Sequence, residues 1–141
     1  GGRLDTIQAG VLLAKLENFK HELKVRNKVA EKYTNKLSKI VQTPVIKPNR
    51  KSAWASYTLR VKNRDSLLAR LKERGIPTSI YYPTPLHLQE CFRYLNYKQN
   101  DLPISEKASN EVISIPMNPF LSDEQIDFIT YNIGENILSS L

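Results

Sequence analysis

About the first quarter of the chain carries one apolar pattern, and it constrains the fold more than any other stretch. From Leu4 to Leu37 apolar side chains recur at spacings of three and four residues, as on one buried face of a helix. Asp5 followed three residues later by Gln8 is typical of a capping box at a helix start. A helix of that length spans about 50 Å, longer than a domain of 141 residues needs. We therefore expect it to bend, or to project and pack on something outside this chain. The apolar positions are Leu4, Ile7, Val11, Leu12, Leu16, Phe19, Leu23, Val29, Tyr33 and Leu37.

The rest of the sequence alternates short strand and helix patterns. Alternation and β-favouring residues predict strands at 53–61, 76–82 and 112–115. Helices are predicted from Asn63 or Asp65 to a left-handed cap at Gly75, over 88–94, over 105–111, and from a second capping box at Ser122 and Gln125 to the end. The predicted fold class is α/β: helices packed on a small mixed sheet of three strands in an α+β sandwich, with a long N-terminal helix.

Composition limits the broad class of protein. A chain of 141 residues with 40% hydrophobic and 25% charged residues fits one ordinary globular domain with a real core. Its one cysteine, Cys91, excludes an internal disulfide framework, and a reducing, cytoplasmic setting is the simplest interpretation. No apolar run approaches the roughly 20 residues of a membrane span, and no signal peptide is visible, so we expect no membrane association. The absence of a methionine before Gly1 indicates a cut or processed chain.

The net charge of +7 raises the possibility of a polyanionic partner. Five lysines recur every four residues along the predicted long helix, with glutamates between them. A spacing of four turns each lysine by about 40° around the helix axis, so they spread over roughly half of its circumference. This pattern favours a solvated helix face over a surface that follows a nucleic acid. The lysines are Lys20, Lys24, Lys28, Lys32 and Lys36.

Most chemistry of self-contained enzymes is missing from this sequence. It has no glycine-rich dinucleotide or phosphate loop, and its only histidines, His21 and His87, are not spaced for a metal site. Cys91 has no neighbouring histidine in the sequence and is interpreted as a packing or bystander residue, not a reactive thiol. His21 lies in the charged part of the long helix and is interpreted as a surface residue. We therefore predict no catalytic residue and no metal site in this chain alone.

Two features remain as candidate binding residues. Arg3 precedes the long helix, where its guanidinium either pairs with Asp5 or, beside free helix amides, grips a phosphate or carboxylate. The second feature is the stretch 76–89, in which a strand pattern ends in tyrosines and Pro83 and Pro85 then stiffen the chain. Tyr82 and His87 in this stretch either hold the loop by stacking and a hydrogen bond or contact a substrate.

Several blocks of the sequence, in this order and over essentially the whole chain, resemble the DegT/DnrJ/StrS family of pyridoxal-phosphate-dependent sugar aminotransferases. The blocks are GRLDTIQAGVLLAKL at 2–16, SAWASYTLRV at 52–61, RGIPTSIYYPTPLHLQ at 74–89, SEK at 105–107 and SIPMNPFLSDEQ at 114–125. The resemblance implies the small C-terminal domain of a fold-type I transferase, spanning residues 1–141, with residues 4–37 as its long connecting helix. The N-terminal domain that carries the cofactor lysine would lie outside this chain.

The resemblance also implies a function for the parent enzyme. A homodimer of this family would transfer an amino group from an amino acid such as glutamate to a nucleotide-linked keto sugar, in amino-sugar or cell-surface polysaccharide biosynthesis. Arg3 matches a position that reaches the neighbouring subunit's site near the cofactor phosphate or the substrate. Tyr82 and His87 would line the sugar-nucleotide side. The family usually has asparagine two residues before that arginine, where this chain has Gly1. The isolated chain is expected to be inactive and to bind no pyridoxal phosphate.

A hypothesis of another class remains open at this point. A small α/β binding or regulatory module with a basic surface, able to bind nucleic acid, would also account for the net charge of +7. The sequence contains no run of interleaved aromatic and basic residues and no zinc finger that would support nucleic-acid binding.

Overall fold

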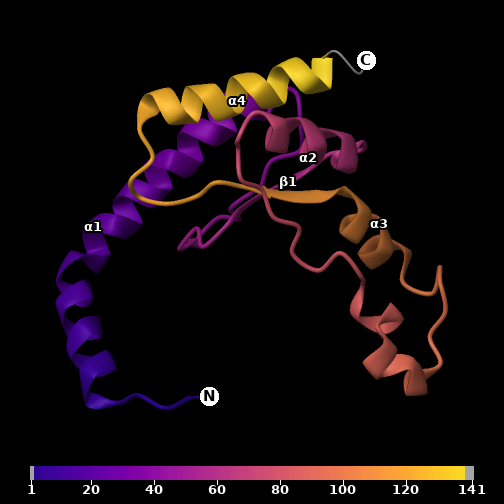
Figure 1. Cartoon of the computed structure of the whole chain (residues 1–141), viewed down its shortest axis with the longest axis horizontal. Helices are drawn as coiled ribbons and strands as arrows, with labels where there is room; N and C mark the ends of the chain where they lie inside the picture. The colour runs from indigo at the N-terminus through magenta and orange to yellow at the C-terminus, as the bar shows by residue number, and fades with distance from the viewer. Residues whose placement is uncertain (1, 139–141) are drawn as a thin grey trace.

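A helix of 32 residues, α1 (Thr6–Leu37), forms one side of the molecule (Figure 1). The computed structural model describes residues 2–138. The Asp5 carboxylate caps the helix by accepting a hydrogen bond from the Gln8 backbone N–H at 3.1 Å, as the sequence predicts. Because the backbone of Asp5 is still extended, the helix begins at Thr6 and not at Leu4. It ends at Leu37, and the N–H of the C-cap residue Ser38 donates to the Thr34 carbonyl.

Strands and shorter helices follow α1 in the order of a mixed α/β fold, which confirms the predicted class. Figure 1 shows α4 lying across the top of the molecule, with α2 beneath it and α3 leading into a separate group of turns. The elements are β1 (Tyr57–Arg60), α2 (Arg64–Glu73), the 3₁₀ turns η1 (Leu86–Leu88) and η2 (Glu90–Leu95), α3 (Pro103–Glu111), β2 (Val112–Ile115) and α4 (Asp123–Leu138).

The sheet is smaller than predicted and is antiparallel. β1 pairs with β2 so that Tyr57 lies opposite Ile115, and the described residues form a sheet of two strands where the sequence predicts a mixed sheet of three. The predicted strand 76–82 contributes one bridge, in which Ser79 exchanges backbone hydrogen bonds of 3.0 and 2.8 Å with Ser114. Pro77 has no N–H to donate, and Tyr82 leaves extended geometry with a φ of 65°.

Other predicted boundaries shift for local reasons. The predicted strand 53–61 begins only at Tyr57, because Trp54 has a left-handed φ of 50°. The predicted helix 88–94 is replaced by the two 3₁₀ turns, and the helix predicted over 105–111 begins earlier, with Pro103 in its first turn. The capping box at Ser122 and Gln125 forms in both directions. The Gln125 N–H donates to Ser122 Oγ at 3.2 Å, and the Ser122 N–H donates to Gln125 Oε1 at 3.0 Å. Gly75 adopts the predicted left-handed conformation, with a φ of 70°.

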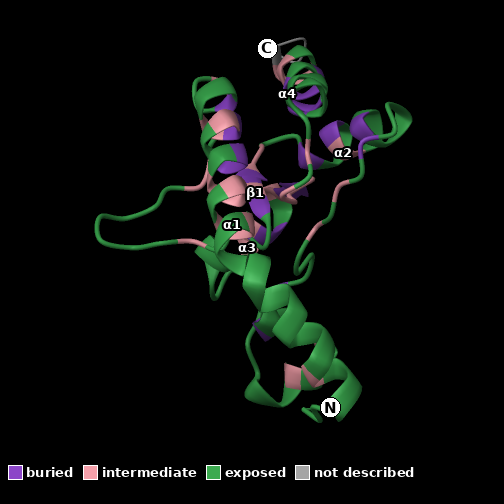
Figure 2. Ribbon diagram, turned by 90° about the vertical axis from the view of Figure 1, so that its left-hand side faces the viewer, coloured by how far each residue is buried: buried purple, intermediate pink, exposed green. Residues whose placement is uncertain are grey.

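The core lies between the second half of α1, the sheet, α2 and α4 (Figure 2). Tyr33 of α1 is fully buried, its ring lies 5.1 Å from that of Tyr57, and its hydroxyl donates to the Pro116 carbonyl at 2.9 Å. Burial raises the pKa of Tyr33, so the hydroxyl keeps the proton that it donates. Burial of the apolar side chains supplies most of the stability of this core. The fully buried aliphatic side chains are Leu37, Leu59, Leu71, Ile113, Ile126 and Ile133.

Candidate functional site

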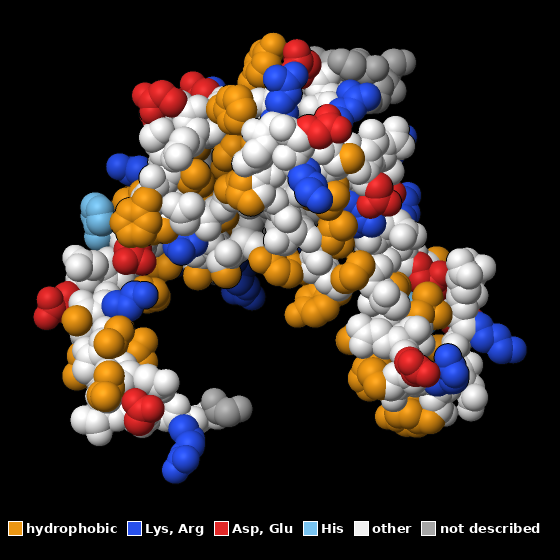
Figure 3. All heavy atoms as spheres, viewed as in Figure 1, with side chains coloured by type: hydrophobic (Ala, Val, Ile, Leu, Met, Phe, Trp, Pro, Cys, Tyr) orange, Lys and Arg blue, Asp and Glu red, His pale blue; other side chains and the backbone are white. Residues whose placement is uncertain are grey.

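The molecule has a wide concave face between two limbs (Figure 3). One limb, which we call the N-terminal limb, is residues 2–20, comprising the segment before α1 and the first half of that helix. The other, which we call the lobe, is residues 84–102 with η1 and η2 (Figure 1). Both limbs extend from the core in the same direction, and large apolar side chains are exposed on each. On the lobe these are Leu86, Leu88, Tyr94, Leu95, Tyr97 and Leu102.

The first half of α1 does not bury the apolar stripe that the sequence predicts. Its large apolar side chains are between 49% exposed, at Phe19, and 82% exposed, at Ile7, whereas Val29, Tyr33 and Leu37 in the second half are buried. The prediction of one continuous buried stripe is therefore wrong within this chain. The helix projects beyond the core, as its length led us to expect. The exposed members of the stripe are Leu4, Ile7, Val11, Leu12, Leu16 and Phe19.

Arg3 lies exposed on the N-terminal limb, two residues before the Asp5 cap of α1. Within residues 2–138 its side chain makes no hydrogen bond or ion pair, and the Asp5 carboxylate is used by the Gln8 N–H. The predicted alternative of an Arg3–Asp5 ion pair is thus not present in the described structure. The Asp5 carboxylate at the N-cap offsets the positive end of the α1 dipole, so the charge that is available to an anion here is that of the Arg3 guanidinium.

Tyr82 lies on the segment that enters the lobe and is 74% exposed. Its φ of 65° is in the left-handed region, which costs a bulky L-residue about 1–2 kcal/mol. Strained residues of this kind gather at ligand-binding sites, because the surrounding structure must hold them in place. The conformation here presents the phenol to solvent.

His87 has a different position: its side chain is only 4% exposed. Its Nε2 lies 3.0 Å from Oε1 of Glu106 on α3, and its ring meets Tyr97 edge-on at a centroid distance of 6.1 Å. The structure therefore contains the loop-holding arrangement that the sequence left open. Contact between His87 and a substrate stays a prediction.

Glu106 connects the lobe to α3, and the sequence analysis did not single it out. Its carboxylate accepts backbone N–H bonds from Asn100 at 2.9 and 3.0 Å and from Leu102 at 3.3 Å, besides the contact with His87. The Asn100 N–H, followed by the His87 hydrogen bond, lowers the pKa of Glu106. The available signal was a carboxylate in the first turn of the helix that Pro103 starts, since such residues often accept nearby N–H groups.

A second set of contacts fixes the middle of α1 to the loops around the sheet. Arg26 Nη1 donates to the carbonyls of Trp54 at 3.0 Å and Met117 at 3.3 Å. The Trp54 indole N–H donates to Asn27 Oδ1 at 3.0 Å. These bonds stabilise the left-handed backbone of Trp54 and fix the position from which the N-terminal limb projects.

The structure does not bring the three predicted site residues into contact. Arg3 belongs to the N-terminal limb, whereas Tyr82 and His87 belong to the segment on the opposite side of the concave face. Among residues 2–138, no group of three or more His, Cys, Asp or Glu side chains is placed to hold a metal ion. In that same range, no helix is both long and apolar enough to cross a membrane.

The concave face is bordered by two limbs, and large apolar side chains on both are exposed in the described structure. The sequence model of the DegT/DnrJ/EryC1/StrS aminotransferase family matches residues 1–133, and the chain belongs to this family. The resemblance stated from the sequence blocks is therefore confirmed.

Curated relatives show how much of a family protein this chain represents. It is 43% identical over 128 residues to the UDP-2-acetamido-2-deoxy-3-oxo-D-glucuronate aminotransferase of Pseudomonas aeruginosa, covering 90% of this chain and 35% of the relative. It is 42% identical to the pleiotropic regulatory protein of Geobacillus stearothermophilus, covering 94% and 37%. The chain thus spans little more than a third of the length of these relatives.

Solved structures agree with the fold. A DegT DnrJ EryC1 StrS aminotransferase from Brucella abortus superposes with a TM-score of 0.89 at 40% identity, over 96% of this chain and 36% of that one. DesV of S. venezuelae, in complex with a ketimine intermediate, gives a TM-score of 0.90 at 30% identity, over 94% of this chain and 36% of that one. These relatives do not favour the alternative of a non-catalytic binding module.

Proposed function

We propose that this chain is the C-terminal small domain of a pyridoxal-phosphate-dependent aminotransferase. The complete enzyme would move an amino group from an amino acid such as glutamate to a nucleotide-linked keto sugar. The observation that carries the proposal is the exposed apolar face of α1 in a chain that spans 35% of the P. aeruginosa relative. Such a surface belongs against another part of the protein. The proposed substrate class follows that relative, which is an aminotransferase named for a UDP-linked 3-oxo sugar acid.

Arg3 is the residue of this chain that fits the cofactor or substrate. Its guanidinium is exposed, has no partner within residues 2–138, and lies beside the N-terminus of α1. A phosphate group, on pyridoxal phosphate or on the sugar nucleotide, matches both the charge and the paired donors of a guanidinium. Pyridoxal phosphate, when bound, supplies the electron sink that lets an amino group leave an amino acid and join a ketone. Arg3 would hold and orient the phosphate.

Tyr82 and His87 would line the sugar-nucleotide side of the cleft. The exposed Tyr82 phenol offers a hydroxyl that can donate to or accept from a sugar hydroxyl. His87 would support this wall from beneath, since its ring is held between Glu106 and Tyr97. The lobe then has a fixed position against which a sugar ring can be oriented.

The same proposal includes an assembly and a setting. In a homodimer, Arg3 would serve the neighbouring subunit's site, because the N-terminal limb and the lobe lie on opposite sides of the concave face within one chain (Figure 1). The single cysteine, Cys91, is consistent with a cytoplasmic location. The product would enter amino-sugar or cell-surface polysaccharide biosynthesis.

The test uses the complete enzyme with pyridoxal phosphate, glutamate and a nucleotide-linked keto sugar. Formation of 2-oxoglutarate and of the amino sugar is followed by a coupled assay and mass spectrometry. We expect Arg3→Ala to lower kcat/KM by about tenfold to a hundredfold, because a charge-assisted phosphate contact is lost.

Arg74→Ala is the matched control, since Arg74 is an equally exposed arginine at the end of α2. It should retain the kinetics of the unmodified enzyme. Equal kinetics for both variants would remove Arg3 from the site, and a complete enzyme that aminates no nucleotide-linked sugar would refute the proposed function.

A further inference from the structure

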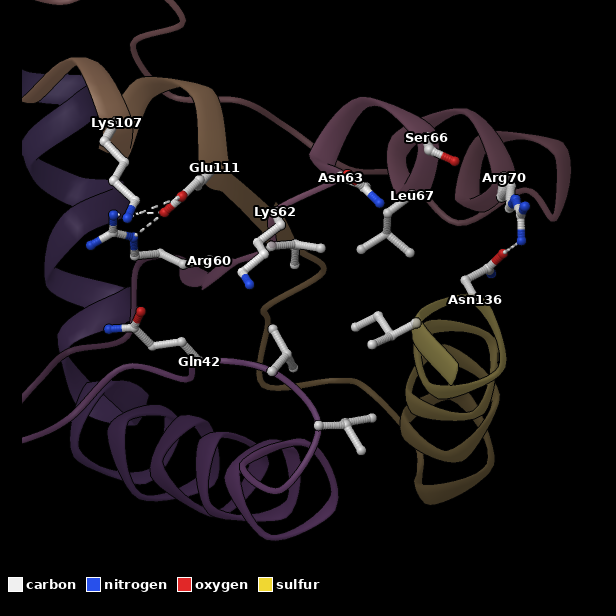
Figure 4. Close-up of a pocket in the computed structure, with 14 residues that line it drawn as sticks. Gln42, Arg60, Lys62, Asn63, Ser66, Leu67, Arg70, Lys107, Glu111 and Asn136 are labelled. Atoms are coloured by element: carbon white, nitrogen blue, oxygen red, sulfur yellow. Dashed lines mark hydrogen bonds and ion pairs between the residues drawn. The ribbon is translucent and has the colours of Figure 1, made fainter. Parts of the chain in front are cut away.

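A cavity of about 580 Å³ opens on a part of the molecule that includes none of Arg3, Tyr82 or His87 (Figure 4). It lies where the chain after α1, the end of β1, α2, α3 and α4 meet, so five separate stretches of sequence form its walls. Its size is that of sites for small organic ligands, which measure about 300–1,000 Å³. The apolar lining consists of Ile40, Val41, Val61, Leu67 and Ile137.

The polar lining of this cavity is strongly cationic. Among the described residues, four basic side chains lie in the walls, whereas a single carboxylate, that of Glu111, lies there. On one side Arg60 donates to Glu111 Oε2 from Nε at 3.1 Å and from Nη2 at 2.7 Å, and Lys107 lies 4.0 Å from Oε1 of the same carboxylate. Glu111 is therefore already neutralised by Arg60, and the charge of Lys107 is largely unbalanced.

Two further cations complete the rim. Figure 4 shows Lys62 projecting toward the middle of the cavity, and its ammonium has no hydrogen bond or ion pair within the described residues. Arg70, on the opposite wall, donates to the neutral Asn136 amide oxygen at 2.9 Å.

We propose that this cavity binds a small organic anion that carries an apolar group. The anionic group would lie among Lys62, Lys107 and Arg60, and the apolar group would cover the aliphatic lining. Charge complementarity selects the anion, and the apolar floor selects against a bare inorganic ion, which leaves that surface wet. The inference does not rest on the proposed aminotransferase function.

The experiment titrates the full-length protein with 8-anilinonaphthalene-1-sulfonate, an aromatic sulfonate whose fluorescence rises in an apolar site. We expect Lys62→Glu to weaken its binding by about fivefold, because an attraction becomes a repulsion. Lys28→Glu, at an exposed lysine of α1 outside the cavity, makes the same charge change and should leave binding unaltered. Phenyl phosphate should displace the probe, and phenol at the same concentration should not.

A second variant keeps the test independent of charge. Ser66→Trp places a large side chain into the cavity from an exposed position on α2, and should abolish the component that Lys62→Glu weakens. Circular dichroism and thermal unfolding verify that each variant is folded. The proposal is overturned if Lys62→Glu binds the probe as tightly as the unmodified protein does. It is also overturned if phenol displaces the probe as effectively as phenyl phosphate does.

Discussion

Replacing Leu16 with glutamine tests whether the exposed half of α1 is an interface. Leu16 is 59% exposed on the N-terminal limb. Glutamine has nearly the helix propensity of leucine, so the substitution changes the polarity of the surface and leaves the helix itself intact. In the chain alone, surface substitutions of this kind change the free energy of unfolding by less than about 0.5 kcal/mol. We expect no larger effect there.

The effect in the complete enzyme follows from the area that remains to be covered. Full burial of a leucine side chain contributes about 1.5–3 kcal/mol, and 59% of the Leu16 surface is available in this structure. Covering it therefore contributes about 1–2 kcal/mol, and a buried amide without a partner adds about 1–3 kcal/mol of cost. The complete enzyme should lose about 2–5 kcal/mol of stability in total.

The assay is urea unfolding of the chain alone and of the complete enzyme, each with Leu16→Gln and with a core control. Leu71→Ala is that control, because Leu71 is fully buried within this chain. It should cost about 2–5 kcal/mol in both contexts. If Leu16→Gln destabilises the chain alone as strongly as Leu71→Ala does, or leaves the complete enzyme unchanged, the N-terminal limb is not an interface.

Two further predictions concern the lobe. The hydrogen bond from the Asn100 N–H, and then that with His87, lower the pKa of Glu106. The stability that the ionised carboxylate gives to the lobe is therefore fully present above the ordinary carboxyl pKa and is lost as the pH falls through the lowered pKa. Backbone hydrogen exchange in residues 84–102, corrected for intrinsic rates, should accelerate in that acid range, and Glu106→Gln should remove this pH dependence. If the pH profile of exchange in Glu106→Gln matches that of the unmodified protein, the role assigned to Glu106 is wrong. Tyr82→Asn should raise stability by up to about 1 kcal/mol, because asparagine tolerates the left-handed conformation, while sugar-nucleotide affinity falls in the complete enzyme; a destabilised variant would contradict the assigned strain.

The features that sequence predicted well are those that a few neighbouring residues determine. The caps at Asp5 and Ser122 depend on side chains three residues from their partners, and both form. Gly75 needs only its own freedom at positive φ to end α2. Each of these structures is determined by residues within a few positions of one another, so it forms whatever the arrangement of the rest of the chain.

The features that sequence predicted poorly depend on distant residues. The pattern at 76–82 is typical of a strand, but pairing with β2 stops after Ser79 because Pro77 and the left-handed Tyr82 lie on either side. Trp54 similarly shortens the first strand, and its backbone is held by Arg26, 28 residues away. Neither contact leaves a periodic signal.

The candidate site shows the same division. Arg3 and Tyr82 are exposed, as a residue that meets a ligand must be. The sequence could not show that His87 faces Glu106, since these residues are separated by 19 positions and belong to different elements. The cationic cavity was also missed, because its lining comes from five separate stretches, within residues 40–42, 60–63, 66–70, 107–111 and 136–137.

The apolar stripe along α1 is buried in its second half and exposed in its first half. Its second half places Val29, Tyr33 and Leu37 in the core of this chain, and its first half leaves Leu16 and Phe19 exposed. The spacing is the same in both halves, which fits the proposal that one continuous face of the helix packs on two different bodies. The contacts of Arg26 with the loops of the sheet lie near the change from the exposed half to the buried half. Those contacts anchor the helix to the core at the point from which the N-terminal limb, with Arg3 at its end, projects.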